Sequence, residues 1–334
     1  KRVAEAGLHP TDDEYNGLLA YVWPAMVKMK KRDDKYRSIR EKHFTTEEGR
    51  DYLRELSIDE LPGLTTAETT AVMLALSFEM GMPIHFVAPA FGFQKNIPYP
   101  DNEKLREMIT PIWNICEKFG VSIGFHSGSG KSAENYQVAG QVTGSNLEIK
   151  TSGRYTYEMG VALSKSSDPY DQELWKDWYN FTIDLASNGV FAEDETERKM
   201  AREFVSLTLD EESSKKAFSS IEDCRTILQS LEPSPDHFFW FEYNFLYVLA
   251  AGGSAEKNSL GDHSSEGYRQ RKRFYSISEQ GKLLYSKRVS EYIIFLAQNT
   301  GLVSSGICVD ALSELETFSE YSDFVGSISN CHSD

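Results

Sequence analysis

The sequence has few cysteines, no long apolar run and a shortage of basic residues. Its four cysteines form no C-x-x-C pair and none has the spacing of a zinc knuckle, a usage that suits a reducing cytoplasm. The most apolar stretch, 238–251, is too short to cross a membrane and is interrupted by Glu242 and Asn244. No signal peptide is visible. These absences predict a cytoplasmic protein without a membrane-spanning segment.

Basic residues number 35 against 51 acidic ones, which gives a formal net charge of −16. An electronegative surface repels phosphate backbones and anionic lipids, so neither nucleic acid nor a membrane is expected as a partner. A small anionic substrate is compatible with this charge, because a local cluster of Lys and Arg in a cleft can hold one carboxylate. The 334 residues are 40% hydrophobic and 12% aromatic, which is enough for a folded core without disulfides.

Strand-like and helix-like segments alternate in the first half of the chain. Residues 1–54 are charged and helical in pattern, and a capping box at 45–48 predicts a helix that continues to Leu56. The following strands are predicted at 56–58, 84–88, 121–125 and 147–150, and the helices at 65–80, 103–120, 134–142 and from 155 onward. This alternation is typical of βαβ units and a parallel sheet, closed either as an open doubly wound sheet or as a (β/α)8 barrel.

The second half is mostly helical in pattern. Helices are predicted at 170–187, 192–203, 211–219 and 276–299. Residues 204–209 are a further strand candidate, and 241–250 fits either a strand or a helix. The polar stretch 250–267 is long enough for a lid or a binding loop. The last thirty residues are acidic and rich in serine, and we expect them to be peripheral.

A Ser/Gly-rich segment, H-S-G-S-G-K-S (126–132), directly follows a predicted strand. One interpretation is a phosphate-binding P-loop, but that motif needs a glycine where Phe125 stands. The other interpretation places a histidine and a lysine at the mouth of a barrel strand. His126 would then ligate a metal or carry a proton, and Lys131 would pair with a substrate carboxylate.

Charged residues share faces of two predicted strands. Glu148 and Lys150 alternate with apolar residues, and charges that point into a barrel need a partner or a function. A mutual salt bridge at the surface is the simpler alternative.

Glu55 and Asp59 also share a face with Ser57, and Glu60 follows. Clustered carboxylates suit a divalent cation or a general base, although an acidic turn before Pro62 explains them equally well. The loop after the strand 84–88 adds Lys95, which could reach a ligand.

Four segments, taken in order, resemble the tagaturonate/fructuronate epimerase family. They are E-L-S-I-D-E (55–60), M-P-I-H-F-V-A-P-A-F (82–91), H-S-G-S-G-K (126–131) and E-I-K-T-S-G (148–153). The family's matching stretches read approximately E-x-S-x-D-E, I-P-x-x-x-I-A-P-K-F, H-S-G-S-D-K and H-L-K-T-A-G. The chain departs from them at Glu148, where the family has His, at Gly130, where it has Asp, and at Ala90, where it has Lys.

The resemblance implies an isomerase of hexuronate catabolism with a TIM-barrel-like (β/α)8 fold. We therefore predict one α/β barrel domain over 1–334, with a helical segment 1–54 and a peripheral tail 303–334. The family's reaction inverts the C4 hydroxyl of a ketouronate. The C4 proton is not acidic, so the plausible route is metal-assisted retro-aldol cleavage and re-addition. The implied cofactor is a divalent metal (zinc, manganese or magnesium), the implied partner is a small sugar acid, and a homo-oligomer is compatible.

Roles follow from the matching positions. The resemblance implies Glu55, Asp59, Glu60 and His126 as catalytic residues, and Glu55, His126 and Glu148 as metal ligands. It implies substrate contacts from Ser127, Ser129, Lys131, Lys150 and Thr151, and the loop after the strand 84–88 adds Lys95 to the predicted substrate contacts. Two alternatives stay open, namely a non-catalytic carbohydrate-binding relative that has lost its metal and a P-loop NTPase.

Overall fold

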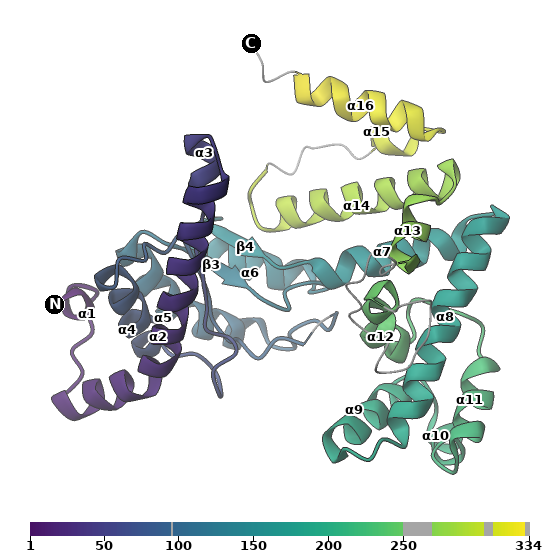
Figure 1. The fold of residues 1–334 in the computed structure, drawn as a ribbon, viewed down its shortest axis with the longest axis horizontal. Helices are drawn as coiled ribbons and strands as arrows, with labels where there is room; N and C mark the ends of the chain where they lie inside the picture. The colour runs from purple at the N-terminus through teal and green to yellow at the C-terminus, as the bar shows by residue number, and fades with distance from the viewer. Residues whose placement is uncertain (95, 250–268, 304–309, 331–334) are drawn as a thin grey trace. The chain divides into compact units, whose positions relative to one another are not determined.

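The structure is a computed structural model that describes residues 1–94, 96–249, 269–303 and 310–330 (Figure 1). These residues form two compact units. Unit 1 comprises the described residues within Lys1–Thr151 and Phe295–Ile307, and unit 2 comprises those within Ser152–Ile294 and Cys308–Asp334. No helix in the described part of the chain has the length and apolar character that a membrane crossing requires.

Unit 1 alternates strands and helices as the sequence predicts. Its elements are α1 (Arg2–Glu5), α2 (Asp12–His43), α3 (Glu47–Arg50), β1 (Glu55–Ser57), α4 (Ala67–Glu79), β2 (Phe86–Ala88), α5 (Asn102–Phe119), β3 (Ser122–Phe125), α6 (Ala133–Thr143) and β4 (Leu147–Ile149). The four strands form one sheet in the order β1-β2-β3-β4, and all neighbours are parallel. The predicted βαβ units and parallel sheet are therefore confirmed.

Side-chain caps fix the helix ends of unit 1. The hydroxyl of Thr66 accepts a hydrogen bond from the backbone of α4, the carboxylate of Asp101 does so for α5, and Ser132 begins α6 with a capping box. Gly120 and Gly144 end α5 and α6 in the left-handed conformation, which glycine adopts without strain. Because α5 and α6 end at these glycines, β3 begins soon after α5 and β4 soon after α6.

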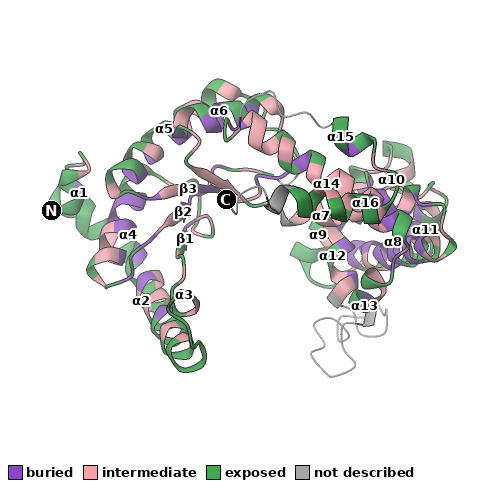
Figure 2. Ribbon diagram, turned by 90° about the horizontal axis from the view of Figure 1, so that it is seen from above, coloured by how far each residue is buried: buried purple, intermediate pink, exposed green. Residues whose placement is uncertain are grey.

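The two faces of the sheet differ in chemistry. Leu56, Val87 and Ile123 are fully buried on the face that α4, α5 and α6 cover (Figure 2). Strand register puts Ser57 beside Ala88, and Gly124 beside Glu148, on the opposite face. One face therefore builds the core, while the other, apart from Phe86, carries polar and very small residues.

Unit 2 is helical. Its elements are α7 (Ser152–Lys165), α8 (Pro169–Val190), α9 (Glu195–Ser206), α10 (Glu211–Ala217), α11 (Ile221–Gln229), α12 (Phe238–Leu249), α13 (Arg269–Tyr275), α14 (Glu279–Asn299, whose last turn belongs to unit 1), α15 (Asp310–Ser313) and α16 (Phe318–Asn330). Its core is a cluster of aromatic rings that includes Trp175, Trp178 and Trp240. The helices predicted in this half of the chain are confirmed.

Some predicted elements differ from the structure. The strand predicted at 204–209 is wrong, because α9 continues to Ser206 with Ala201 and Val205 buried one helical turn apart. The ambiguous stretch 241–250 belongs to helix α12 up to Leu249. The helix predicted from 45 to 56 ends at Arg50, because residues 55–57 pair with β2 instead.

The described residues do not decide two further predictions, the closed barrel and the binding loop. The described residues contain one four-stranded parallel sheet in a mostly helical α/β protein, and the closed eight-stranded barrel stays a prediction. The binding loop predicted at 250–267 lies outside the described residues, as do parts of the predicted tail.

Candidate functional site

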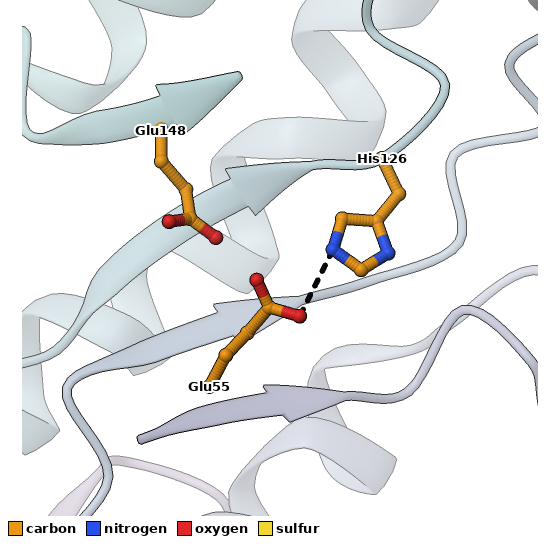
Figure 3. A group of neighbouring side chains, drawn as sticks. All are labelled: Glu55, His126 and Glu148. Carbon is orange, nitrogen blue, oxygen red and sulfur yellow. Dashed lines mark ion pairs between the residues drawn. The ribbon is translucent and has the colours of Figure 1, made fainter. Parts of the chain in front are cut away.

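Three side chains from separate parts of the sheet converge on one point (Figure 3). Glu55 begins β1, His126 directly follows β3, and Glu148 lies in β4. One ligand atom of each lies within 4.8 Å of the others. Sequence analysis names the same three residues as metal ligands, and the structure brings them together.

Small residues on the sheet make room for this meeting. Gly124 lies in β3 next to Glu148, and a Cβ on Gly124 would lie 2.7 Å from Glu148 Oε1. The same added atom would lie 3.3 Å from the Cβ of Ala88 in β2. The carboxyl group of Glu148 therefore occupies the space that a side chain at position 124 would fill. Small residues on the two central strands let side chains from both edge strands approach each other.

Asp59 orients the imidazole of His126. Asp59 Oδ2 lies 2.9 Å from His126 Nδ1, and the His126 side chain is only 9% exposed. A carboxylate only accepts hydrogen bonds, so Nδ1 carries the hydrogen in this contact. The neutral ring then has its lone pair on Nε2, which is the nitrogen that faces the two glutamates.

The contact between His126 and Glu55 is close but not aligned as a hydrogen bond. His126 Nε2 lies 3.0 Å from Glu55 Oε1, yet Nε2 has no hydrogen-bond partner of acceptable geometry among the described residues. The two observations are compatible, because distance and direction are separate requirements of a hydrogen bond. A nitrogen and an oxygen that lie this close without forming a hydrogen bond could both bind one cation placed between them.

The two glutamates ionise over different ranges of pH. Burial, a hydrogen bond with Glu55 and the charge of Glu55 raise the pKa of Glu148 to about 7. Burial also opposes ionisation of Glu55, but hydrogen bonds from Glu148 and Ser57, together with the nearby His126 ring, outweigh it and lower the pKa of Glu55 to about 2. Below about pH 7 the pair therefore holds one proton between its two carboxyl groups.

The donor set fits a divalent cation. Two carboxylates and one imidazole are ligands that Zn²⁺, Mn²⁺ and Mg²⁺ sites share, although the oxygen majority favours the harder ions. Positive charge between the glutamates would replace the proton they share, and His126 Nε2 supplies a buried nitrogen without a hydrogen-bond partner in the described residues. Glu55, His126 and Glu148 are thus the residues that could hold the ion.

The loop after β3 depends on its serine and glycines. Ser127 has a φ of 53°, an uncommon conformation for a side-chain-bearing residue, directly beside His126. A Cβ on Gly128 would lie 2.6 Å from the carbonyl oxygen of Phe125, so this position admits only glycine without movement of the backbone. Ser129 is buried, and its carbonyl accepts a hydrogen bond from the backbone of Asn96.

The side chain of Lys131 is buried and binds backbone carbonyl groups. Its side chain is 5% exposed, and its Nζ donates hydrogen bonds to the carbonyl oxygens of Gln94 and Ile97. Burial lowers the pKa of Lys131 to about 8. An amine held by backbone carbonyls is not available to a nucleotide phosphate or a substrate carboxylate, and instead it ties two loops together.

The remaining predicted site residues have different surroundings. Lys150 is exposed just beyond β4, and Thr151 is half-buried next to it. Glu60 is exposed and lines a cleft of about 560 Å³ that Glu55 and Ser57 also line. Lys95 lies outside the described residues.

A buried ion pair that was not predicted from the sequence stabilises the start of β1. Asp33 of α2 is 6% exposed, and it accepts hydrogen bonds from Arg54 Nε at 2.6 Å and from the Tyr52 hydroxyl at 2.7 Å. Helical spacing from Val22 and Met26 places Asp33 on the buried face of α2, and this periodicity is the signal that could have revealed it. Arg54 directly precedes Glu55, so the pair fixes the backbone that presents the cluster.

The fold and the cluster together define a class of protein: α/β proteins in which polar side chains from separate strands meet over one face of a parallel sheet. The family model described as UxaE, tagaturonate epimerase, matches residues 34–205, which is just over half of the chain. The chain therefore belongs to the tagaturonate epimerase family.

One solved structure supports the fold. The native crystal structure of fructuronate-tagaturonate epimerase UxaE from Cohnella laeviribosi matches with a TM-score of 0.54 and 18% identity, over 88% of this chain and 53% of that chain. Its form with two glycerols matches at 0.47 and 19% identity, over 85% and 50%. The chain thus spans about half the length of the solved structures it matches. The comparison with curated proteins finds no match.

Proposed function

We propose that this protein is a sugar-acid epimerase that inverts the C4 carbinol of a ketouronate with the help of a divalent cation. The observation that carries the proposal is the convergence of Glu55, His126 and Glu148 within 4.8 Å, in a chain that belongs to the tagaturonate epimerase family. An α/β barrel would suit this chemistry, because it gathers strand ends around one site.

The reaction we propose is redox-neutral. Loss of the C4 hydroxyl proton lets the C3–C4 bond break, and its electrons move onto the C2 carbonyl oxygen to leave an enediolate and a C4 aldehyde. The aldehyde rotates, C3 adds to its other face, and the C4 oxygen takes a proton back. When bound, a divalent cation supplies positive charge that stabilises the oxygen anions of this sequence.

The chain's own residues divide the remaining work. Asp59 holds the His126 ring so that Nε2 stays directed at the glutamates. Glu60 lines the same cleft as Glu55 without belonging to the ligand group, so its carboxylate is free to take the C4 hydroxyl proton. Lys150, exposed beyond β4, is our candidate for binding a substrate oxygen.

The test combines metal analysis with turnover. We expect the purified protein to bind one divalent ion and to interconvert tagaturonate and fructuronate, followed by NMR. Glu148→Gln keeps the shape of the side chain but removes a charged ligand, and we expect it to lower kcat/KM about 100-fold or more. The matched control is Glu103→Gln, an exposed glutamate in α5, which should stay within about twofold of the wild type.

Two results would overturn the proposal. The first is full turnover by chelator-treated protein that contains no metal. The second is wild-type turnover by Glu148→Gln. Binding of a sugar acid by a protein that never turns it over would instead identify the non-catalytic relative.

A further inference from the structure

The cleft beside β1 has one wall made by a single face of α2. Its lining residues on that helix recur at helical spacing: Ala25, Lys28, Met29, Arg32, Asp33 and Tyr36. The lining also includes Glu55, Ser57 and Glu60. Basic side chains of α2 therefore line the same cleft as the strand that carries one of the proposed metal ligands.

Two of these basic side chains, Lys28 and Arg32, have no partner in the described part of the chain. Neither makes an ion pair or a hydrogen bond there, although both are exposed. Glu60 lines the same cleft, and no ion pair within 4 Å joins it to either cation in the described residues. Two other cations of α2 do have partners, since Lys30 pairs with Asp34, and Arg37 pairs with Asp33.

The arrangement of these two cations costs stability unless an anion binds. Lys28 and Arg32 are four residues apart on one helix, and like charges at that spacing repel each other. Neither residue has an acidic neighbour three or four positions away in the sequence. In a chain of net charge −16, two adjacent unpaired cations in a cleft form a local site for an anion.

The cleft and the metal cluster share Glu55, which lines one and belongs to the other. A sugar acid has oxygens that a cation can bind at one end and a carboxylate at the other. We propose that Lys28 and Arg32 bind the carboxylate of the sugar acid while its carbonyl end lies at Glu55, His126 and Glu148. This inference rests on the proposed function and deepens it, because it names the residues that distinguish an acid from a neutral sugar.

The test compares two sugars that differ only in the carboxylate. Calorimetric titration with D-galacturonate and D-galactose measures the preference for the acid without requiring turnover. We expect the wild type to bind the acid about tenfold more tightly or better, and Lys28→Ala/Arg32→Ala to lose that preference. The control is Lys31→Ala/Lys35→Ala, which removes the same charge at the same spacing from residues of α2 outside the cleft, and which should keep the preference.

Turnover provides a second reading. With tagaturonate as substrate, the Lys28→Ala/Arg32→Ala variant should raise KM about tenfold and leave kcat within about twofold, because the carboxylate lies away from the reacting bond. A wild-type KM in this variant overturns the cleft assignment and leaves the epimerase proposal standing. A wild type that binds galactose as tightly as galacturonate also overturns it. A third outcome separates the two proposals. If the wild type did not turn tagaturonate over, but only the cleft variant lost the preference for galacturonate over galactose, the anion site would be supported and the epimerase proposal would be overturned.

Discussion

Replacing Asp59 tests whether the proposed metal cluster depends on the orientation of His126. Asp59 makes the only contact with Nδ1 found in the described residues, at 2.9 Å. In Asp59→Ala the ring loses this hydrogen bond and can turn Nε2 away from the glutamates. Asp59→Asn keeps an acceptor oxygen at the same place but loses the charge.

The structure sets the size of the effect. A hydrogen bond to a charged group contributes about 1.5–3 kcal/mol, and we take the lower end because a quarter of the Asp59 side chain is exposed. About 1.4 kcal/mol corresponds to a tenfold change in affinity. We therefore expect Asp59→Ala to weaken binding of Mn²⁺ about tenfold, and Asp59→Asn to weaken it about threefold.

Competition with a fluorescent chelator measures these affinities directly. Asp51→Ala is the control, because Asp51 is an exposed aspartate on the approach to β1, and it should bind Mn²⁺ as the wild type does. If Asp59→Ala bound Mn²⁺ as tightly as the wild type, the idea that Asp59 positions the imidazole would be refuted.

Further predictions concern stability and the space around the cluster. In urea unfolding, Asp33→Ala should lower the free energy of unfolding by about 3 kcal/mol, because it leaves the guanidinium of Arg54 without its carboxylate partner. Asp34→Ala, at the surface, should lower it by less than about 0.5 kcal/mol. Gly124→Ala should weaken Mn²⁺ binding with little loss of stability, because its Cβ meets the mobile end of a glutamate side chain. Gly128→Ala should cost about 1–3 kcal/mol in urea unfolding, because its Cβ meets a backbone oxygen. In metal-free protein, the raised pKa of Glu148 supports folding fully below pH 4.5 and loses that support as the pH rises to about 7. Urea unfolding of Glu148→Gln should be flatter over that window, and a slope equal to that of the wild type would contradict the assignment.

The order of strands and helices in unit 1 was predictable because local signals agree. Apolar strand segments end at polar residues, and the glycines at 120 and 144 stop the intervening helices. The parallel arrangement then implies that Glu55, His126 and Glu148 approach each other, although 93 residues separate the first from the last. Local pattern and topology were sufficient for this part of the site.

Contacts that depend on tertiary packing were not predictable. Lys131 is a basic residue in a glycine-rich loop, which suggests a ligand contact, and only the folded loops reveal that backbone carbonyls bind its amine. The segment 204–209 is rich in β-formers, but a buried helical face at Ala201 and Val205 outweighs that local preference. Lys28 and Arg32 look like ordinary surface charges until the cleft beside β1 is known.

Pulsed electron paramagnetic resonance of bound Mn²⁺ tests the central claim most directly, because it detects nitrogen ligands of the ion. We expect modulation from one imidazole nitrogen in the wild type. We expect the same modulation in His85→Ala, because the ring of His85 accepts a hydrogen bond from the Arg54 backbone and does not belong to the proposed metal site. The same signal should vanish in His126→Ala. Mn²⁺ bound without any nitrogen modulation, or modulation that persists in His126→Ala, would contradict the proposed metal site.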